Sequence, residues 1–233
     1  MKLITIILSY FNEDKEDIYR HLNNWNNFSE SVKDQVSFII VDDCSKIPIN
    51  KMIDNNNLDL SLYRILDDIK WNTSGVRNLG ALQANTPYLL ILDMDTVVDS
   101  NIIEQIIEIC NNNINKSIFF DFNRIVVNDA NHPKNNQNHP AVCLIRKQDY
   151  WSVNGCDEDL SGNYGYTSNL FKIKLLGNNI KQESLRNISI LYYAEAQKDN
   201  LDRNRKHNRN LFDKKRKNNK LPKKLIRFNW KKI

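Results

Sequence analysis

Apolar and polar residues alternate in blocks along the first half of this chain. Four apolar runs of strand length stand at residues 3–10, 36–43, 60–66 and 87–95. Between them, apolar residues recur at helical spacing in segments 14–34 and 74–85, and again in 100–113, where Ser100 is a suitable N-cap. Strands that are apolar throughout and alternate with helices predict an α/β fold: a mostly parallel, Rossmann-like central sheet flanked by helices.

The pattern changes after about residue 115. Strands are predicted at 117–127, from 141, and at 187–196, with a helix after the Gly- and Tyr-rich stretch that begins at 157. His132 and His139 fall in a polar stretch that we interpret as a surface loop. We therefore expect one domain, 1–200, with halves 1–115 and 116–200, and no linker between them.

Charge is distributed unevenly. Residues 201–233 carry 14 of the 33 Lys and Arg and 2 of the 28 Asp and Glu, a local net charge of +12 in a chain of net charge +5. We expect this basic C-terminal tail to be helical or loosely attached. It is interpreted as a solvated arm, as a contact with anionic membrane in which Phe228 and Trp230 insert, or as a nucleic-acid contact.

Other features bear on location. No apolar run approaches the length of a membrane-spanning helix, and the first residues lack the pattern of a signal peptide. The four cysteines are scattered without a C-x-x-C, which favours reduced thiols. The expected location is cytoplasmic, with peripheral attachment at the cytoplasmic membrane face as an extension of it.

Acidic residues close two of the predicted strands. Asp42 and Asp43 end the second run, and Asp93 and Asp95 end the fourth. Ligands of such sheets bind beyond the carboxyl ends of the strands. Alternate residues of an extended segment point to one side, so Asp93 and Asp95 are predicted to share a cation, Mg²⁺ or Mn²⁺.

The order of motifs is more specific than any one of them. ITIILSYFNE (4–13), FIIVDDCS (38–45), WNTSGVRNLG (71–80) and YLLILDMD (88–95) resemble the nucleotide-binding half of GT-A glycosyltransferases, particularly family 2. GCDEDLSGNYGYTSN (155–169) resembles their galactosyltransferase-like C-terminal segment. The resemblance covers roughly residues 3–195.

This resemblance implies roles for matched positions. A nucleoside-diphosphate sugar, UDP-sugar above all, would be the donor substrate, bound with Mn²⁺ or Mg²⁺. Metal ligands would be Asp93 and Asp95. The donor would contact the following residues: Ser9, Phe11, Asp42, Asp43, Gly75, Arg77, Asn78 and Asp93.

The sequence departs from the family where a base is expected. Thr167 and Ser168 occupy the positions of the usual Glu-Asp, and neither ionises near neutral pH. A nearby acid of the stretch Asp157, Glu158 and Asp159 replaces it, or the enzyme is retaining, or the chain is a poor catalyst. The family's late metal-ligand histidine is also missing, with Glu195 or His207 as substitutes.

Aromatic residues complete the expectations. Trp151, Tyr164 and Tyr166 either pack within the loop or contact the acceptor. The resulting hypothesis is a metal-dependent glycosyltransferase acting on a glycan or lipid-linked acceptor hydroxyl. The alternatives are a non-catalytic nucleotide-sugar or glycan-binding module, and a nucleic-acid-binding protein that acts through its tail.

Overall fold

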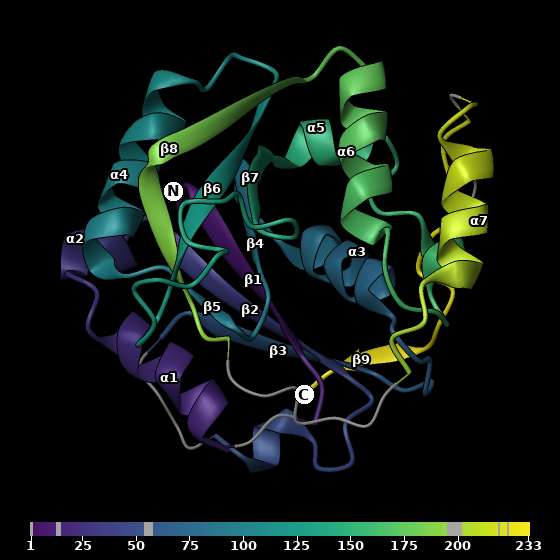
Figure 1. Cartoon of the computed structure of the whole chain (residues 1–233). Helices are drawn as coiled ribbons and strands as arrows, with labels where there is room; N and C mark the ends of the chain where they lie inside the picture. The colour runs from purple at the N-terminus through teal and green to yellow at the C-terminus, as the bar shows by residue number, and fades with distance from the viewer. Residues whose placement is uncertain (1, 13–14, 54–57, 195–201, 219, 223) are drawn as a thin grey trace.

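The computed structural model describes residues 2–12, 15–53, 58–194, 202–218, 220–222 and 224–233. Its strands form one sheet in the order β5-β8-β6-β7-β4-β1-β2-β3-β9 (Figure 1). They are β1 Ile4–Tyr10, β2 Val36–Asp43, β3 Leu60–Ile65, β4 Tyr88–Leu92, β5 Thr96–Val97, β6 Ile118–Val126, β7 Cys143–Arg146, β8 Lys181–Tyr192 and β9 Trp230–Lys232. The predicted α/β fold is confirmed.

The sheet has the predicted parallel centre and also contains antiparallel pairs. Strands β3, β2, β1 and β4 lie parallel in its centre, and β6 is parallel to β8. The other neighbouring strands run antiparallel: β3 with β9, β4 with β7, β6 with β7, and β5 with β8. Strands β1, β2 and β4 of this parallel group are largely apolar, since helices cover both of their faces, whereas β3 includes Ser61 and Arg64.

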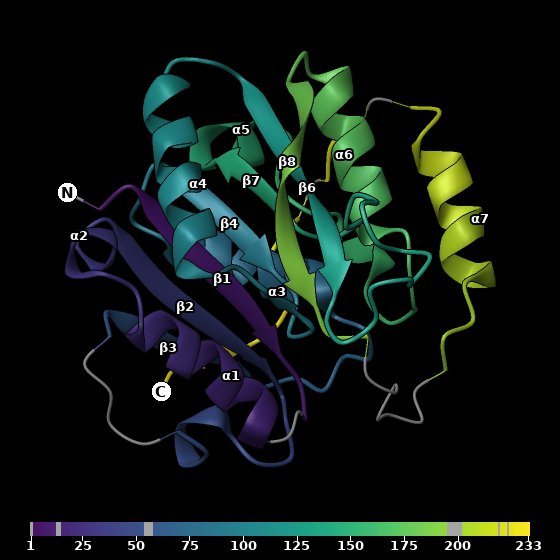
Figure 2. The same cartoon turned by 60° about the vertical axis from the view of Figure 1, so that its left-hand side comes forward.

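Helices cover the two faces of this sheet (Figures 1 and 2). One face packs against α1 Lys15–Asn26, α2 Glu30–Lys33 and α4 Ser100–Asn112. The other packs against α3 Thr73–Gln83, α5 Lys147–Ser152 and α6 Thr167–Gly177. Two short 3-10 helices, η1 Ile49–Lys51 and η2 Glu158–Leu160, lie in connections, and α7 Lys206–Lys215 lies outside α6.

Strand β1 shows how the sequence builds both core layers. Its side chains alternate between faces, so Ile6 joins the layer that contains Trp25, while Ile7 joins the other. A β-carbon on Gly80 of α3 would stand 2.4 Å from Cγ2 of Ile7. Glycine at this position therefore lets α3 approach the central strand.

Three predicted element boundaries were wrong. The helix expected over 14–34 divides into α1 and α2, because Asn26 and Asn27, at the end of α1, are poor helix formers and Ser29 adopts an extended backbone. The cap of α4 is Asp99, whose carboxylate accepts from the N–H of Ile102 at 3.0 Å. Strand β8 begins at Lys181, six residues before the predicted start at 187. The apolar pattern did not indicate its first half, because those residues are polar and largely exposed.

The described part of the tail is folded onto the domain. Strand β9 extends the sheet beyond β3, and Phe228 is buried in the α3 layer. Asn208 of α7 is fully buried and donates to the carbonyls of Leu160, Asn163 and Gly165. Of the two alternatives expected for the tail, helical or loosely attached, the first describes α7, and the apolar residues of the tail pack into the core.

A separate finding concerns membranes. Within the described ranges, no helix is both long and apolar enough to span one.

Candidate active site

The site is built where parallel strands β2, β1 and β4 end. Asp43 is the last residue of β2, and Asp93 follows the last residue of β4. Strand β1 lies between them and ends at Tyr10, whose register partner is Asp42. Neighbouring strands are about 4.8 Å apart, so the two acids flank β1 at a separation on the order of 10 Å.

Asp42 and Asp43 point into different surroundings. Asp42 is fully buried and accepts from the N–H groups of Ser45 and Ile49 and from Arg64 at 2.6 Å. Its oxygens fix the loop after β2, and its contact with the donor stays a prediction. Burial raises the pKa of Asp43 to about 7, partly opposed by a hydrogen bond from Asn72. Asp43 is therefore the member of the pair suited to bind a ligand.

The D-x-D segment is a turn and not an extended strand. The N–H of Thr96 donates to the carbonyl of Asp93 at 3.0 Å, and the Thr96 hydroxyl donates to the same carbonyl at 2.8 Å. The prediction that alternation places both carboxylates on one side was therefore wrong in its premise. The segment is also fixed from β8, where the N–H of Tyr193 donates to the carbonyl of Asp95 at 2.8 Å.

Arg77 connects the first aspartate to the second half of the chain. It is 3% exposed, and its guanidinium donates to Asp93 at 3.0 Å and to the Ser168 hydroxyl at 2.8 Å. Its Nε atom is buried without a hydrogen-bond partner among the described residues. Ser168, at the position where the family places an acid, is thus an acceptor of a hydrogen bond from Arg77.

Two other residues of α3, Asn78 and Gly75, contact the second half of the chain and the tail. Asn78 is fully buried; its amide donates to Glu158 and to the Cys156 carbonyl, and accepts from the Tyr150 hydroxyl and the Cys156 N–H. These bonds occupy the side-chain amide of Asn78, whose contact with the donor stays a prediction. A β-carbon on Gly75 would stand 2.5 Å from the Phe228 ring, so glycine at this position leaves room for Phe228 of the tail to pack against α3.

The end of β1 contributes Ser9 and Phe11. The hydroxyl of Ser9 is buried and has no partner among the described residues. Phe11 is half-buried in the loop after β1, which is joined to the loop after β2 by the N–H of Asn12 donating to Ser45 at 3.0 Å. Both stay predicted donor contacts.

The three expected base candidates are held by the tail. Lys215 donates to Asp157 and to Asp159 at 2.6 Å each, and Arg227 also pairs with Asp159. Glu158 accepts from Asn78 and from two backbone N–H groups, of Ile226 and Arg227. Hydrogen bonds from Lys215, offset in part by burial and strengthened by Arg227, lower the pKa of Asp159. All three acids are thus paired with other residues, and a base among them stays a prediction.

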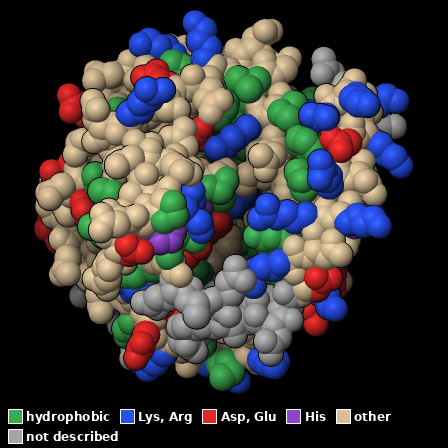
Figure 3. Space-filling view, viewed as in Figure 1, with side chains coloured by type: hydrophobic (Ala, Val, Ile, Leu, Met, Phe, Trp, Pro, Cys, Tyr) green, Lys and Arg blue, Asp and Glu red, His purple; other side chains and the backbone are tan. Residues whose placement is uncertain are grey.

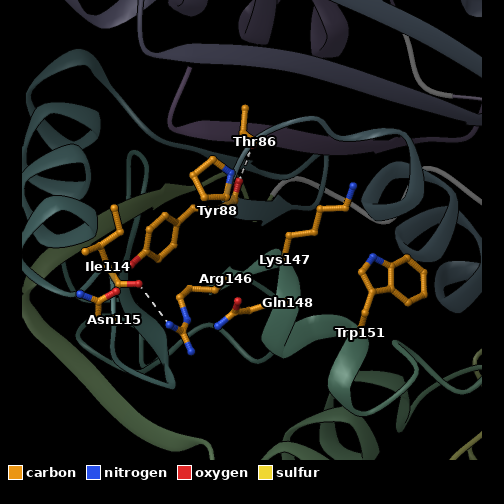
Figure 4. Close-up of a pocket in the computed structure, with 9 residues that line it drawn as sticks. Thr86, Tyr88, Ile114, Asn115, Arg146, Lys147, Gln148 and Trp151 are labelled. Carbon is orange, nitrogen blue, oxygen red and sulfur yellow. Dashed lines mark hydrogen bonds between the residues drawn. The ribbon is translucent and has the colours of Figure 1, made fainter. Parts of the chain in front are cut away.

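The aromatic candidates separate in space. Trp151 lines a groove of about 460 Å³ with Thr86, Tyr88 and Arg146, beside the first residue of β4 and so at the opposite end of that strand from Asp93 (Figure 4). Trp151 is therefore distant from the other candidate residues, and its contact with the acceptor stays a prediction. In the groove, Arg146 donates to the Ile114 carbonyl and pairs with Asp149, so its charge is already neutralised.

Tyr164 and Tyr166 have different neighbours. The centre of the Tyr166 ring lies 4.9 Å from that of Phe212 of α7, and its contact with the acceptor stays a prediction. The centre of the Tyr164 ring lies 4.6 Å from that of the Trp71 ring, and the guanidinium carbon of Arg205 lies 5.2 Å from the centre of the Tyr164 ring. Tyr164 stays a predicted acceptor contact.

The region beside the D-x-D turn contains residues that the sequence did not single out. Burial raises the pKa of Tyr192, and the neighbouring charges of Asp95 and Asp93 add to this rise. His139 is 4% exposed, and burial lowers its pKa to about 4. Its Nδ1 accepts from two backbone N–H groups, so the expectation of a surface-loop histidine was wrong.

Asn72 was also missed. It is buried, donates to Asp43 at 3.3 Å and accepts from the Ser161 hydroxyl at 2.9 Å, thereby linking the strand end to the second half. Its place just before a helix was the available signal, since Asn is a preferred residue there. Of the suggested third metal ligands, His207 is exposed on α7, and Glu195 lies outside the described residues.

A divalent cation fits this edge only with ligands from a substrate. Over the described part of the chain, no cluster of three or more His, Cys, Asp or Glu residues is arranged to hold a metal. Asp93 and Asp95 offer carboxylate oxygens, and one oxygen of Asp93 is already paired with Arg77. Mg²⁺ commonly uses one or two carboxylates and completes its shell with water and phosphate oxygens. Figure 3 shows a hollow near the centre of this face, bordered by Lys, Arg, Asp and Glu side chains.

Comparisons with known proteins identify the family. The profile of glycosyl transferase family 2 matches residues 5–164. The crystal structure of residues 1–349 of TarS from S. aureus has a TM-score of 0.66 and 18% identity, and the match covers 83% of this chain and 60% of that one. The complex of the same TarS residues with UDP-GlcNAc has a TM-score of 0.65 and 18% identity, and the match covers 85% of this chain and 60% of that one. The mannosyltransferase PcManGT from Pyrobaculum calidifontis, in complex with GDP-Man and Mn²⁺, has a TM-score of 0.66 and 11% identity over 84% and 58%.

These structural matches concern the fold. The chain spans about 60% of the length of the TarS structure. No curated protein matches its sequence. The profile covers more than half of the residues and contains the strand ends with Asp43, Asp93 and Asp95. The chain belongs to glycosyl transferase family 2.

Proposed function

We propose that this chain transfers a sugar from a nucleoside-diphosphate donor, a UDP-sugar, to a hydroxyl of a glycan or lipid-linked acceptor. The observation that carries this proposal is the convergence of Asp43, Arg77 and the Asp93–Asp95 turn on the carboxyl ends of three adjacent strands. Ligands of open α/β sheets bind at this edge. The matched family and the nucleotide-sugar complexes of two structural neighbours support the same donor class.

Asp43 is the residue proposed to recognise the base. As a carboxylate it accepts a hydrogen bond from the N3–H of uracil, and Asn72 holds its orientation. Its raised pKa reflects burial, so a donor N–H that satisfies the ionised form relieves part of that cost. The partnerless hydroxyl of Ser9, between the two acidic strand ends, is proposed to contact the donor as well.

Arg77 is proposed to act through Asp93 rather than by direct contact with phosphate. It is buried, and its two Nη atoms are used by Asp93 and Ser168. The pair fixes Asp93 and keeps a positive charge next to the site. Mn²⁺ or Mg²⁺, held by Asp93 and Asp95, would neutralise charge on the departing diphosphate when bound. The acceptor hydroxyl attacks the anomeric carbon, and Tyr164 is proposed to contact the acceptor.

Donor turnover tests this proposal. Purified protein is incubated with a panel of sugar nucleotides, with and without Mn²⁺, and release of the nucleoside diphosphate is measured. Asp95→Ala is expected to abolish release, whereas Asp34→Ala, at an exposed residue after α2, is expected to leave it unchanged. If no donor binds and Asp95→Ala matches the wild type, the proposal fails.

A second candidate is a non-catalytic nucleotide-sugar or glycan-binding module. It is favoured by the pairing of Asp157, Glu158 and Asp159 with the tail and by Ser168 at the position of the family's acid. Calorimetry distinguishes the two: this candidate predicts binding of UDP without consumption of any donor.

A further inference from the structure

Helix α7 has two faces of different chemistry. Its inward face carries buried Asn208, which donates to three carbonyls of the loop before α6, and Lys215, which pairs with Asp157 and Asp159. Phe212 packs on Tyr166 from the same face. These contacts give the helix one fixed orientation on the domain.

The outward face is basic. Lys206, Arg209, Lys214 and Lys217 lie on or directly after α7, are exposed, and form no ion pair among the described residues. Asp213 is the one acid of α7 within the described sequence, and it pairs with Arg216. Lys and Arg side chains gather on the right of the face in Figure 3, over α7. Exposed like charges repel one another, so a surface that concentrates them favours an anionic ligand.

The tail's apolar residues do not accompany these cations. Phe228 is buried, Trp230 packs on Tyr63 at 5.9 Å, and Phe212 is covered by Tyr166. Stable attachment to a membrane interface requires buried apolar area in addition to basic charge. The basic surface therefore lacks exposed aromatic anchors and suits a soluble polyanion better than a lipid surface.

The basic surface begins beside the candidate active site. Arg205, just before α7, lies over Tyr164, and Arg203 lies 5.3 Å from the centre of the Trp71 ring. The Trp71 ring packs against Tyr164, and the next residue, Asn72, donates to Asp43. Cations thus continue from the neighbourhood of Asp43 along a helix roughly 15 Å long.

We propose that the outward face of α7 binds phosphate groups along a polymeric, phosphate-bearing acceptor. The proposal rests on the proposed glycosyl transfer and names its acceptor class. A chain with repeated phosphates would lie along Lys206, Arg209 and Lys217, pass Arg205, and present a hydroxyl beside Tyr164. Lysine and arginine bind phosphate through charge-assisted hydrogen bonds, and each such contact releases counterions.

Fluorescence anisotropy with labelled linear polyphosphate tests this surface in the full chain. The variant K206E/R209E/K217E reverses three cations of the outward face. The control K51E/K116E/K181E reverses three exposed lysines elsewhere, none of which forms an ion pair in the described structure, and gives the same change in net charge. UDP-GlcNAc binding to each variant is measured by calorimetry, which reports on the donor site separately.

The α7 variant is expected to bind polyphosphate at least tenfold more weakly than the wild type. Its slope of log Kd against log salt should fall by about 3, since each lost phosphate contact removes about 1. The control variant should retain most of the polyphosphate affinity and most of the salt dependence. Equal losses in the two variants, or unchanged binding in the α7 variant, overturn the proposal.

Two further arms address other anions. Preferential binding to vesicles of phosphatidylcholine and phosphatidylglycerol in equal parts, or to single-stranded DNA, over polyphosphate also overturns the proposal in favour of those ligands. If UDP-GlcNAc binds none of the proteins but polyphosphate distinguishes the variants, the donor proposal is the one that fails.

Discussion

Lys215→Met removes the ammonium that joins the tail to the acidic loop. The Lys215 nitrogen lies 2.6 Å from an oxygen of Asp157 and an oxygen of Asp159. The Asp157 side chain is 4% exposed and that of Asp159 is 42% exposed. Methionine keeps most of the aliphatic stem, so the substitution tests charge and hydrogen bonding more than packing.

The magnitude follows from this difference in burial. A lost hydrogen bond between charged groups costs about 1.5–3 kcal/mol when one partner stays buried, which describes Asp157. Asp159 is exposed enough for water and salt to screen most of its contribution. We expect the free energy of unfolding to fall by about 2 kcal/mol, and Tm by about 6 °C in a chain of this size.

Urea and thermal unfolding, followed by circular dichroism near pH 7, measure this loss. Lys217→Met is the control, because Lys217 is exposed and forms no ion pair in the described structure; it should change the free energy by less than about 0.5 kcal/mol. Asp157→Asn combined with Lys215→Met should be less destabilising than the sum of the two single changes. Equal effects of Lys215→Met and Lys217→Met would refute the reasoning.

Three further predictions concern the site and the core. UDP-GlcNAc binding, measured by calorimetry, should strengthen by up to about thirtyfold between about pH 5.5 and 8.5. Burial raises the pKa of Asp43 to about 7, and the ionised carboxylate is the form that accepts an N–H of the base. The variant Asp43→Asn should remove this pH dependence. Gly80→Ala should lower the free energy of unfolding in urea by about 1–3 kcal/mol, since its β-carbon would overlap Ile7; a neutral or stabilising result, as helix propensity alone suggests, would contradict the geometry. Arg77→Lys keeps the charge but cannot reach both partners of the guanidinium, so we expect a loss of about 1–2 kcal/mol in unfolding free energy, with unchanged stability as the contrary result.

Much of the parallel half of the fold could be predicted from the sequence. Runs such as 36–43 are apolar on both faces, and only strands covered by helices on both sides satisfy that pattern. The strand-end position of Asp43 followed from the same reasoning. Asp93 was likewise predicted to follow the end of a parallel strand, so the sequence predicted the edge of the sheet at which the candidate site lies, while the register of β1 between β2 and β4 is known only from the structure.

Its chemistry was less accessible. The D-x-D segment was predicted to be extended, but a local hydrogen bond from Thr96 closes it into a turn, which periodicity does not report. The roles of Glu158 and Lys215 depend on contacts between residues far apart in the chain. The sequence offered one signal for these contacts, the complementary charge of the acidic stretch and the basic tail. This signal indicates that the two segments attract each other, but it does not show which residues pair.

Strand β9 has a consequence for how the sheet is completed during folding. It pairs with β3, from which it is separated by most of the sequence, and it forms the outermost strand beyond β3. Until β9 pairs, β3 presents unpaired backbone groups of the kind that invite pairing with another chain. Native contacts between such distant segments form slowly, which prolongs that exposure. Removal of residues 230–232 would therefore leave the edge of β3 open to association with a second chain.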